Sequence, residues 1–146
     1  MGIEENKAMV HRYYELFNQQ ELDAYVEVIA DIAFPENFTR EQNKQLDIMW
    51  FKAFPDLKAT VLDIVAEGDK VSFIRVLSGT HTGEPFMGIP ATGKKIETKA
   101  ALFWRIADNK IVEGSIVSDP GPLQSLGVIP TREEAMKSYK ETHNLE

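Results

Sequence analysis

The hydrophobic pattern of this chain changes its period once, close to Pro55. Before this proline, apolar residues recur at every third or fourth position, which is the spacing of one face of an α-helix. After it, apolar and polar residues alternate, as they do in strands that bury one face of a sheet. A helical segment followed by consecutive strands indicates an α+β domain, with helices packed on an antiparallel sheet.

The helical part of the pattern predicts three helices before Pro55. The first carries a broad apolar stripe that includes Tyr13 and Phe17. The third begins after Thr39, because Gln42 three residues later completes a capping box, and Pro55 ends it. The predicted helices are residues 9–17, 22–29 and 40–54, with a connection over residues 33–38.

The alternating part of the pattern predicts four strands joined in chain order. Residues 67–69 and 108–109 contain the Gly, Asp and Asn typical of tight hairpin turns. Residues 79–94 form a longer loop rich in Gly, Pro and Thr, of the kind that often flanks a binding site. The predicted strands are residues 57–66, 71–78, 96–106 and 111–118.

The length of 146 residues suits one hydrophobic core, so we expect a single domain over residues 1–146. Near its end, Thr131 and Glu134 have the spacing of a helix cap. The polar helix that follows runs to about His143, which makes residues 131–146 a C-terminal helical tail.

Charge and composition exclude several classes of function. The net charge of −7 and the lack of a Lys/Arg cluster argue against nucleic acids and anionic membranes as partners. The absence of cysteine excludes thiolate metal sites, and three dispersed histidines give no metal-ligand spacing. No apolar run is long enough to cross a bilayer, and the N-terminal sequence is unlike a signal peptide, so we expect a cytoplasmic protein.

Four segments of the sequence resemble the SnoaL-like polyketide cyclase family of the nuclear transport factor 2-like superfamily, and the resemblance spans residues 10–130. The segments, in chain order, are FPDLKATVLDIVAEGDKV, GTHTGEPFMGIPATGK, FWRIADNKIVEG and LQSLGVIP. The resemblance implies a cone-shaped fold, in which a strongly curved antiparallel sheet packs on three N-terminal helices around one apolar cavity. It also implies a homodimer and cofactor-free, metal-free acid–base chemistry on a small hydrophobic carbonyl compound.

The residues that transfer the proton in that family are replaced in this chain. The family pattern places an aspartate in a His-x-Asp element shortly after the turn that corresponds to residues 108–111. By this count the histidine position is Gly114 and the aspartate position is Ile116. A second family histidine, on the preceding strand, corresponds to Leu102. None of these side chains can exchange a proton near neutral pH.

Asp119 and His81 are the remaining candidates for catalysis. Asp119 falls where many relatives carry a second acidic residue, and burial beside the cavity would raise its pKa as a general base requires. The alternative, which the Asp-Pro sequence favours, is that Asp119 only starts a turn. His81 could titrate at the cavity mouth, but a structural hydrogen bond to the following loop is the simpler interpretation.

Arg75 interrupts an otherwise apolar strand and allows two interpretations. An enzyme similar to an epoxide hydrolase would use such an arginine between two carboxylates, here Asp63 and Asp119, to position water. The simpler interpretation places Arg75 on the outer face of the sheet, where it pairs across strands with Glu97 or Asp63.

The cavity wall is expected to be apolar and aromatic, which suits a small hydrophobic ligand. Three functions remain open: a cyclase- or isomerase-type enzyme with Asp119 as base, a non-catalytic ligand-binding module, and an assembly role. The loop over residues 84–92 acts as a lid in one interpretation and as packing in another. The residues expected to contact a ligand are Phe17, Trp50, Phe86, Leu102, Trp104, Ile116 and Ser118.

Overall fold

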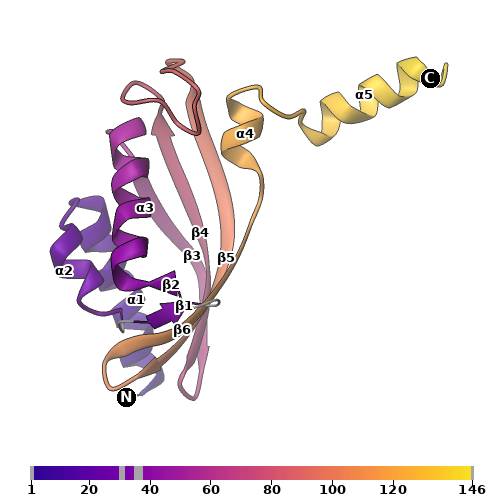
Figure 1. The fold of residues 1–146 in the computed structure, drawn as a ribbon. Helices are drawn as coiled ribbons and strands as arrows, with labels where there is room; N and C mark the ends of the chain where they lie inside the picture. The colour runs from indigo at the N-terminus through magenta and orange to yellow at the C-terminus, as the bar shows by residue number, and fades with distance from the viewer. Residues whose placement is uncertain (1, 30–31, 35–37, 146) are drawn as a thin grey trace.

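The computed structural model describes residues 2–29, 32–34 and 38–145, and Figure 1 shows their arrangement. Helices α1, α2 and α3 lie on one side of a curved sheet, which confirms the predicted α+β class. The elements in chain order are α1 (Ile3–Asn18), α2 (Leu22–Val26), β1 (Ile32–Phe34), β2 (Phe38–Thr39), α3 (Arg40–Ala53), β3 (Lys58–Glu67), β4 (Lys70–Thr80), β5 (Lys95–Ala107), β6 (Lys110–Ser118), α4 (Gly121–Ser125) and α5 (Arg132–Thr142).

The predicted capping box at the start of α3 is present. The backbone N–H of Gln42 donates to Thr39 Oγ1 over 3.1 Å, and the backbone N–H of Thr39 donates to Gln42 Oε1 over 2.8 Å. Each bond satisfies a backbone donor that has no partner inside the helix. The helix therefore begins at the residue that the sequence predicts.

The predicted segments differ from the structure in four places. The first helix begins earlier than its apolar stripe indicates, because α1 starts at Ile3. The second helix is wrong at its end, because α2 stops at Val26 and Ile29 instead forms a β-bridge with Ile111. The predicted connection over residues 33–38 contributes to the two short paired strands β1 and β2, while its residues 35–37 lie outside the described residues. The short helix α4 was not predicted.

Strands β3, β4, β5 and β6 pair antiparallel in chain order, as expected from the hairpin turns. Burial alternates strictly along β5, so one face of the sheet is the inner face and lies under the helices. On this face, Arg75, Ala100 and Ser118 form one row across β4, β5 and β6. Phe73, Leu102 and Ile116 form the next row. Arg75, Leu102, Ile116 and Ser118 of these two rows line the floor of the cavity described below.

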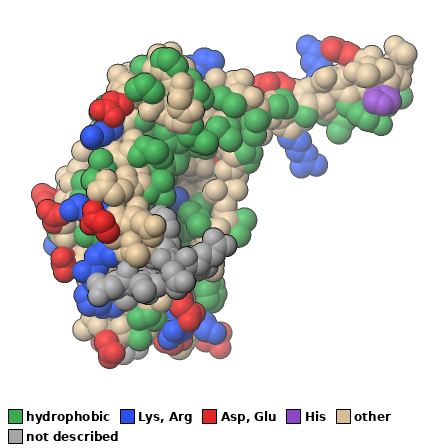
Figure 2. All heavy atoms as spheres, in the orientation of Figure 1, with side chains coloured by type: hydrophobic (Ala, Val, Ile, Leu, Met, Phe, Trp, Pro, Cys, Tyr) green, Lys and Arg blue, Asp and Glu red, His purple; other side chains and the backbone are tan. Residues whose placement is uncertain are grey.

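The tail helix α5 extends away from the rest of the protein (Figure 1), and the space-filling view shows it standing clear of the sheet and of helices α1–α3 (Figure 2). It begins where predicted, because Thr131 Oγ1 accepts a hydrogen bond from the backbone N–H of Glu134 over 3.1 Å. None of its residues is buried. In the described part of the chain, no helix combines the length and the apolar character that crossing a lipid bilayer requires.

Candidate active site

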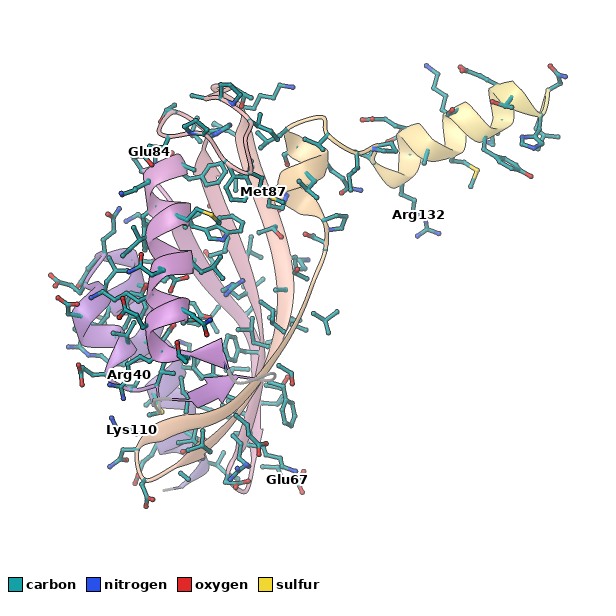
Figure 3. The ribbon with its side chains drawn as sticks, viewed as in Figure 1. Arg40, Glu67, Glu84, Met87, Lys110 and Arg132 are labelled. Atoms are coloured by element: carbon teal, nitrogen blue, oxygen red, sulfur yellow. The ribbon has the colours of Figure 1, made fainter. Side chains whose placement is uncertain are left out.

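A cavity of about 420 Å³ lies between the inner face of the sheet and the helices α1, α3 and α4. In Figure 3, side chains of α3 and of the sheet point toward one another across this space, and Glu84 and Met87 mark the loop at one end of it. Most of the lining is apolar or aromatic. The polar lining side chains are the ones that decide the chemistry.

Six of the seven residues expected to contact a ligand line this cavity. They are Phe17, Trp50, Leu102, Trp104, Ile116 and Ser118. The seventh, Phe86, is not among the lining residues. Its ring packs on Trp50 and Phe54, with ring centroids 4.9 and 5.1 Å away, so it supports the wall from behind.

The positions of the replaced family residues lie side by side. Leu102 on β5 pairs directly with Ile116 on β6, and both side chains line the cavity. Gly114, the other replaced position, pairs with Trp104 in the next row and also lines it. This part of the floor therefore offers only apolar contact.

Asp119 borders the cavity, but its carboxylate is fully engaged in a turn. Its Oδ1 accepts hydrogen bonds from Thr98 Oγ1 (2.7 Å) and from the N–H of Gly121 (2.9 Å), and its Oδ2 accepts one from the N–H of Lys99 (3.1 Å). Partial burial raises the pKa of Asp119, but these hydrogen bonds and the Lys99 charge outweigh it and lower the pKa below the usual value. The expected raised pKa is therefore wrong.

His81 is fully buried and is not among the residues that line the cavity. Its Nδ1 accepts from the backbone N–H of Thr92 over 3.3 Å, so the ring proton lies on Nε2 and is donated to the carbonyl oxygen of Glu84, also over 3.3 Å. These bonds join His81, at the start of the loop between β4 and β5, to Glu84 and Thr92 later in the same loop. They match the structural interpretation of His81 and place it away from a bound ligand.

Arg75 lies on the inner face of the sheet, so the predicted outer-face position is wrong. It lies between the buried Phe73 and Leu77 on the same face of β4, and it lines the cavity. Its Nη1 donates to the hydroxyl of Tyr14 over 3.4 Å. Asp63, one of its expected partners, is instead exposed at an irregular point of β3 with φ of 48°.

Asp47 on α3 is an acidic lining residue that the sequence did not predict as part of the site. Its Oδ2 accepts hydrogen bonds from the Tyr25 hydroxyl over 2.8 Å and from Asn43 Nδ2 over 3.4 Å. Burial raises the pKa of Asp47 to about 6, against the opposing effects of the Tyr25 hydrogen bond and the charge of Arg75. Asn43, Asp47 and Trp50 have the spacing of one helix face, and this signal could have placed Asp47 beside Trp50.

The site also contains hydrogen-bond donors without acceptors. Arg75 Nε and Trp104 Nε1 are buried and have no hydrogen-bond partner among the described residues. Burial raises the pKa of Tyr14, and Arg75 opposes this only in part, so the Tyr14 hydroxyl keeps its proton. A carboxyl whose pKa is raised to about 6 thus shares an apolar cavity with the guanidinium of Arg75 and the hydroxyl of Tyr14.

The comparisons with known proteins identify the family. The sequence model of the SnoaL-like polyketide cyclase family matches residues 7–124, so the chain belongs to this family. A search of curated proteins finds no match.

Solved structures show the same fold. AclR from Streptomyces galilaeus, a proposed hydroxylase, is 28% identical, with a TM-score of 0.82 over 88% of this chain and 100% of its own. IdmH from Streptomyces antibioticus, a proposed polyketide cyclase, is 32% identical, with a TM-score of 0.72 over 84% of this chain and 98% of its own. TsrD from Streptomyces laurentii, at 21% identity and a TM-score of 0.75 over 84% of this chain and 95% of its own, shares the fold.

Proposed function

We propose that this protein is an enzyme that moves a proton on a small hydrophobic carbonyl compound, with Asp47 as the base. One observation carries the proposal: a carboxyl with a pKa of about 6 lies in the same apolar cavity as Arg75. A general base works best when its pKa is close to the working pH, because it is then both ionised and basic. Asp119, the candidate base from the sequence, has a lowered pKa and a carboxylate engaged by three hydrogen bonds.

The proposed reaction begins with proton abstraction. Asp47 takes a proton from the carbon next to the substrate carbonyl, and the electron pair moves onto the carbonyl oxygen to give an enolate. The guanidinium of Arg75 and the hydroxyl of Tyr14 donate hydrogen bonds to that oxygen as its charge develops. The enolate carbon then attacks a second carbonyl of the same molecule, and Asp47 returns its proton to the new alkoxide. Return of the proton to carbon would instead give an isomerase.

The apolar lining supplies the binding energy for the rest of the substrate. Each methylene that moves from water into such a lining contributes about 0.8 kcal/mol. IdmH, a relative at 32% identity, is a proposed polyketide cyclase, which supports a cyclisation for this chain.

The epoxide hydrolase alternative receives less support from the geometry. It requires a second carboxylate beside Arg75 that is free to hold water. Asp119 is engaged by three donors, and Asp63 is exposed and is not among the lining residues. Asp47 is therefore the one carboxylate among the described lining residues that is free to act beside Arg75, and the second carboxylate is lacking.

Exchange of hydrogen for deuterium tests the proposal without knowledge of the final product. Each member of a panel of polycyclic and linear hydrophobic ketones is incubated with the protein in D₂O, and NMR follows the loss of the proton next to the carbonyl. We expect exchange by the wild type, with a rate that rises as the pH passes about 6 and Asp47 ionises. Asp47→Asn should lower the rate about 10²–10⁴-fold.

Asp119→Asn is the matched control, since it changes the other cavity carboxylate in the same way. We expect this variant to keep most of the exchange rate. Exchange that survives in Asp47→Asn would contradict the proposal. Saturable binding of panel compounds without exchange would indicate the non-catalytic binding module instead.

A further inference from the structure

Tyr25 touches the proposed base although it is not among the residues that line the cavity. Tyr25 belongs to α2, and its side chain is completely buried and contacts both α1 and α3. Its ring packs on Tyr13 and Phe17, with ring centroids 4.9 and 5.6 Å away. Its hydroxyl donates to Asp47 Oδ2 over 2.8 Å, which makes it the closest hydrogen-bond donor to that carboxyl among the described residues.

Both hydrogen bonds to the Asp47 carboxyl fall on the same oxygen. Tyr25 reaches Oδ2 from α2, and Asn43 reaches it from one turn earlier on α3. Among the described residues, no hydrogen bond reaches Oδ1. The carboxyl is therefore held by one oxygen, and the other is left open.

The Tyr25 hydroxyl is fixed in place and remains a donor. Lys44 on α3 pairs with Asp23 on α2 over 2.6 Å, which joins the two helices close to the Tyr25 contact. Burial, and then the negative charge of Asp47, raise the pKa of Tyr25 far above its usual value, so the hydroxyl keeps its proton at any ordinary pH.

We propose that Tyr25 is a positioning residue, which holds Oδ2 of Asp47 so that Oδ1 alone takes the proton from the substrate. This inference rests on the proposed function of Asp47 as base. Tyr25 acts through Asp47 and does not touch the substrate. A tyrosine in the helical core thereby determines which oxygen of Asp47 faces the substrate, and it lowers the pKa of that carboxyl.

The hydrogen bond has a defined effect on ionisation. It stabilises the charged carboxylate, so its removal raises the pKa of Asp47. In the part of the chain that the structure describes, the other ionisable groups that act on Asp47 are Arg75 from β4 and Tyr13 and Tyr14 from α1. Removal of the Tyr25 hydroxyl leaves all three in place.

The test compares Tyr25→Phe with Tyr13→Phe, because each removes one buried hydroxyl from the same aromatic cluster. The side-chain carboxyl carbon of Asp47 is titrated by NMR in the ligand-free protein. We expect its midpoint to rise by about one pH unit in Tyr25→Phe and to stay near the wild-type value in Tyr13→Phe. The pH profile of deuterium exchange should shift upward by the same amount in Tyr25→Phe.

Replacement of Tyr25 by 3,5-difluorotyrosine gives a second, opposite test that keeps the hydroxyl. Fluorine makes the hydroxyl a stronger donor, so the Asp47 midpoint should fall. An unchanged midpoint in both Tyr25 variants, or an equal rise in Tyr13→Phe, would overturn the positioning role even if Asp47→Asn abolishes exchange. Opposite midpoint shifts in the two Tyr25 variants, together with a wild type that exchanges no panel compound, would support the Tyr25–Asp47 contact and contradict the proposed function.

Discussion

The Asp47 carboxyl makes the free energy of unfolding depend on pH. Its pKa rises from 3.8 to about 6 on folding, so the folded protein binds this proton more tightly than the unfolded chain does. The stability gained from that proton is fully present below pH 3.8 and is lost as the pH rises through about 6. The whole effect is about 3 kcal/mol.

We therefore predict that Asp47→Asn stabilises the protein at neutral pH. An asparagine carries no charge to bury, and its oxygen still accepts from Tyr25. Urea unfolding of both proteins at pH 5 and at pH 7.5 measures the difference. The free energy of unfolding of the variant should exceed that of the wild type by more at pH 7.5 than at pH 5. An equal or reversed difference would contradict the raised pKa of Asp47.

At the level of residues, the sequence predicts the apolar part of the site better than its polar part. Strand alternation places Leu102 and Ile116 on the cavity floor. The same alternation places Arg75 beside Phe73 and Leu77, but the high cost of burying a charge favoured the outer face for it. The state of Asp119 depends on backbone N–H groups from β5 and α4, and no local pattern reveals these.

At the level of elements, the loop between β4 and β5 completes the end of α3. The backbone N–H groups of Gly83 and Glu84 donate to the carbonyl oxygens of Ala53 and Lys52 over 3.1 and 2.8 Å. The last carbonyl groups of a helix have no partner within it, so these bonds satisfy them. The approach is so close that a Cβ at position 83 would overlap the carbonyl oxygen of Lys52.

We predict that Gly83→Ala lowers the free energy of unfolding by about 1–3 kcal/mol, because both crowded groups belong to the backbone and cannot turn away. Thr82→Ala is the control. It truncates an exposed neighbouring side chain and should change stability by less than about 0.5 kcal/mol. Urea unfolding of the two variants measures both effects. A Gly83→Ala variant as stable as its control would show that the loop does not pack against α3 in solution.

The elements that the sequence predicts are those that local rules determine. Thr39 and Thr131 cap the helices that follow them, and the hairpin turns define four consecutive strands. The end of α2 depends instead on the bridge from Ile29 to Ile111, which are far apart in the chain. Helix α4 is a single short turn, and its apolar pattern is too brief to distinguish it from a loop.

At the level of the whole molecule, α5 contributes nothing to the core. We predict that removal of residues 132–146 leaves the urea midpoint and the m-value unchanged, because no residue of the helix is buried. Fluorescence of Trp50 and Trp104, which both line the cavity, reports the unfolding of the rest of the chain. A lower midpoint in the shortened protein would show that α5 packs against the sheet or its helices in solution.

The homodimer expected from the family resemblance stays a prediction. The outer face of the sheet exposes apolar side chains that such a contact would cover. Val117, Phe103 and Leu62 are 76%, 46% and 41% exposed. Charged neighbours such as Lys99 surround them, a mixture that permits an interface without requiring one.

The polar groups and the apolar floor of the cavity come from different elements of the fold. Asp47 and Arg75 are carried by α3 and β4, whereas the apolar floor of Leu102 and Ile116 belongs to β5 and β6. For protein engineering, this separation would allow the range of bound compounds to be altered independently of the proposed catalytic groups. A library restricted to positions 102 and 116 would vary the size and shape of the accepted compound and leave the proposed proton-transfer groups in place.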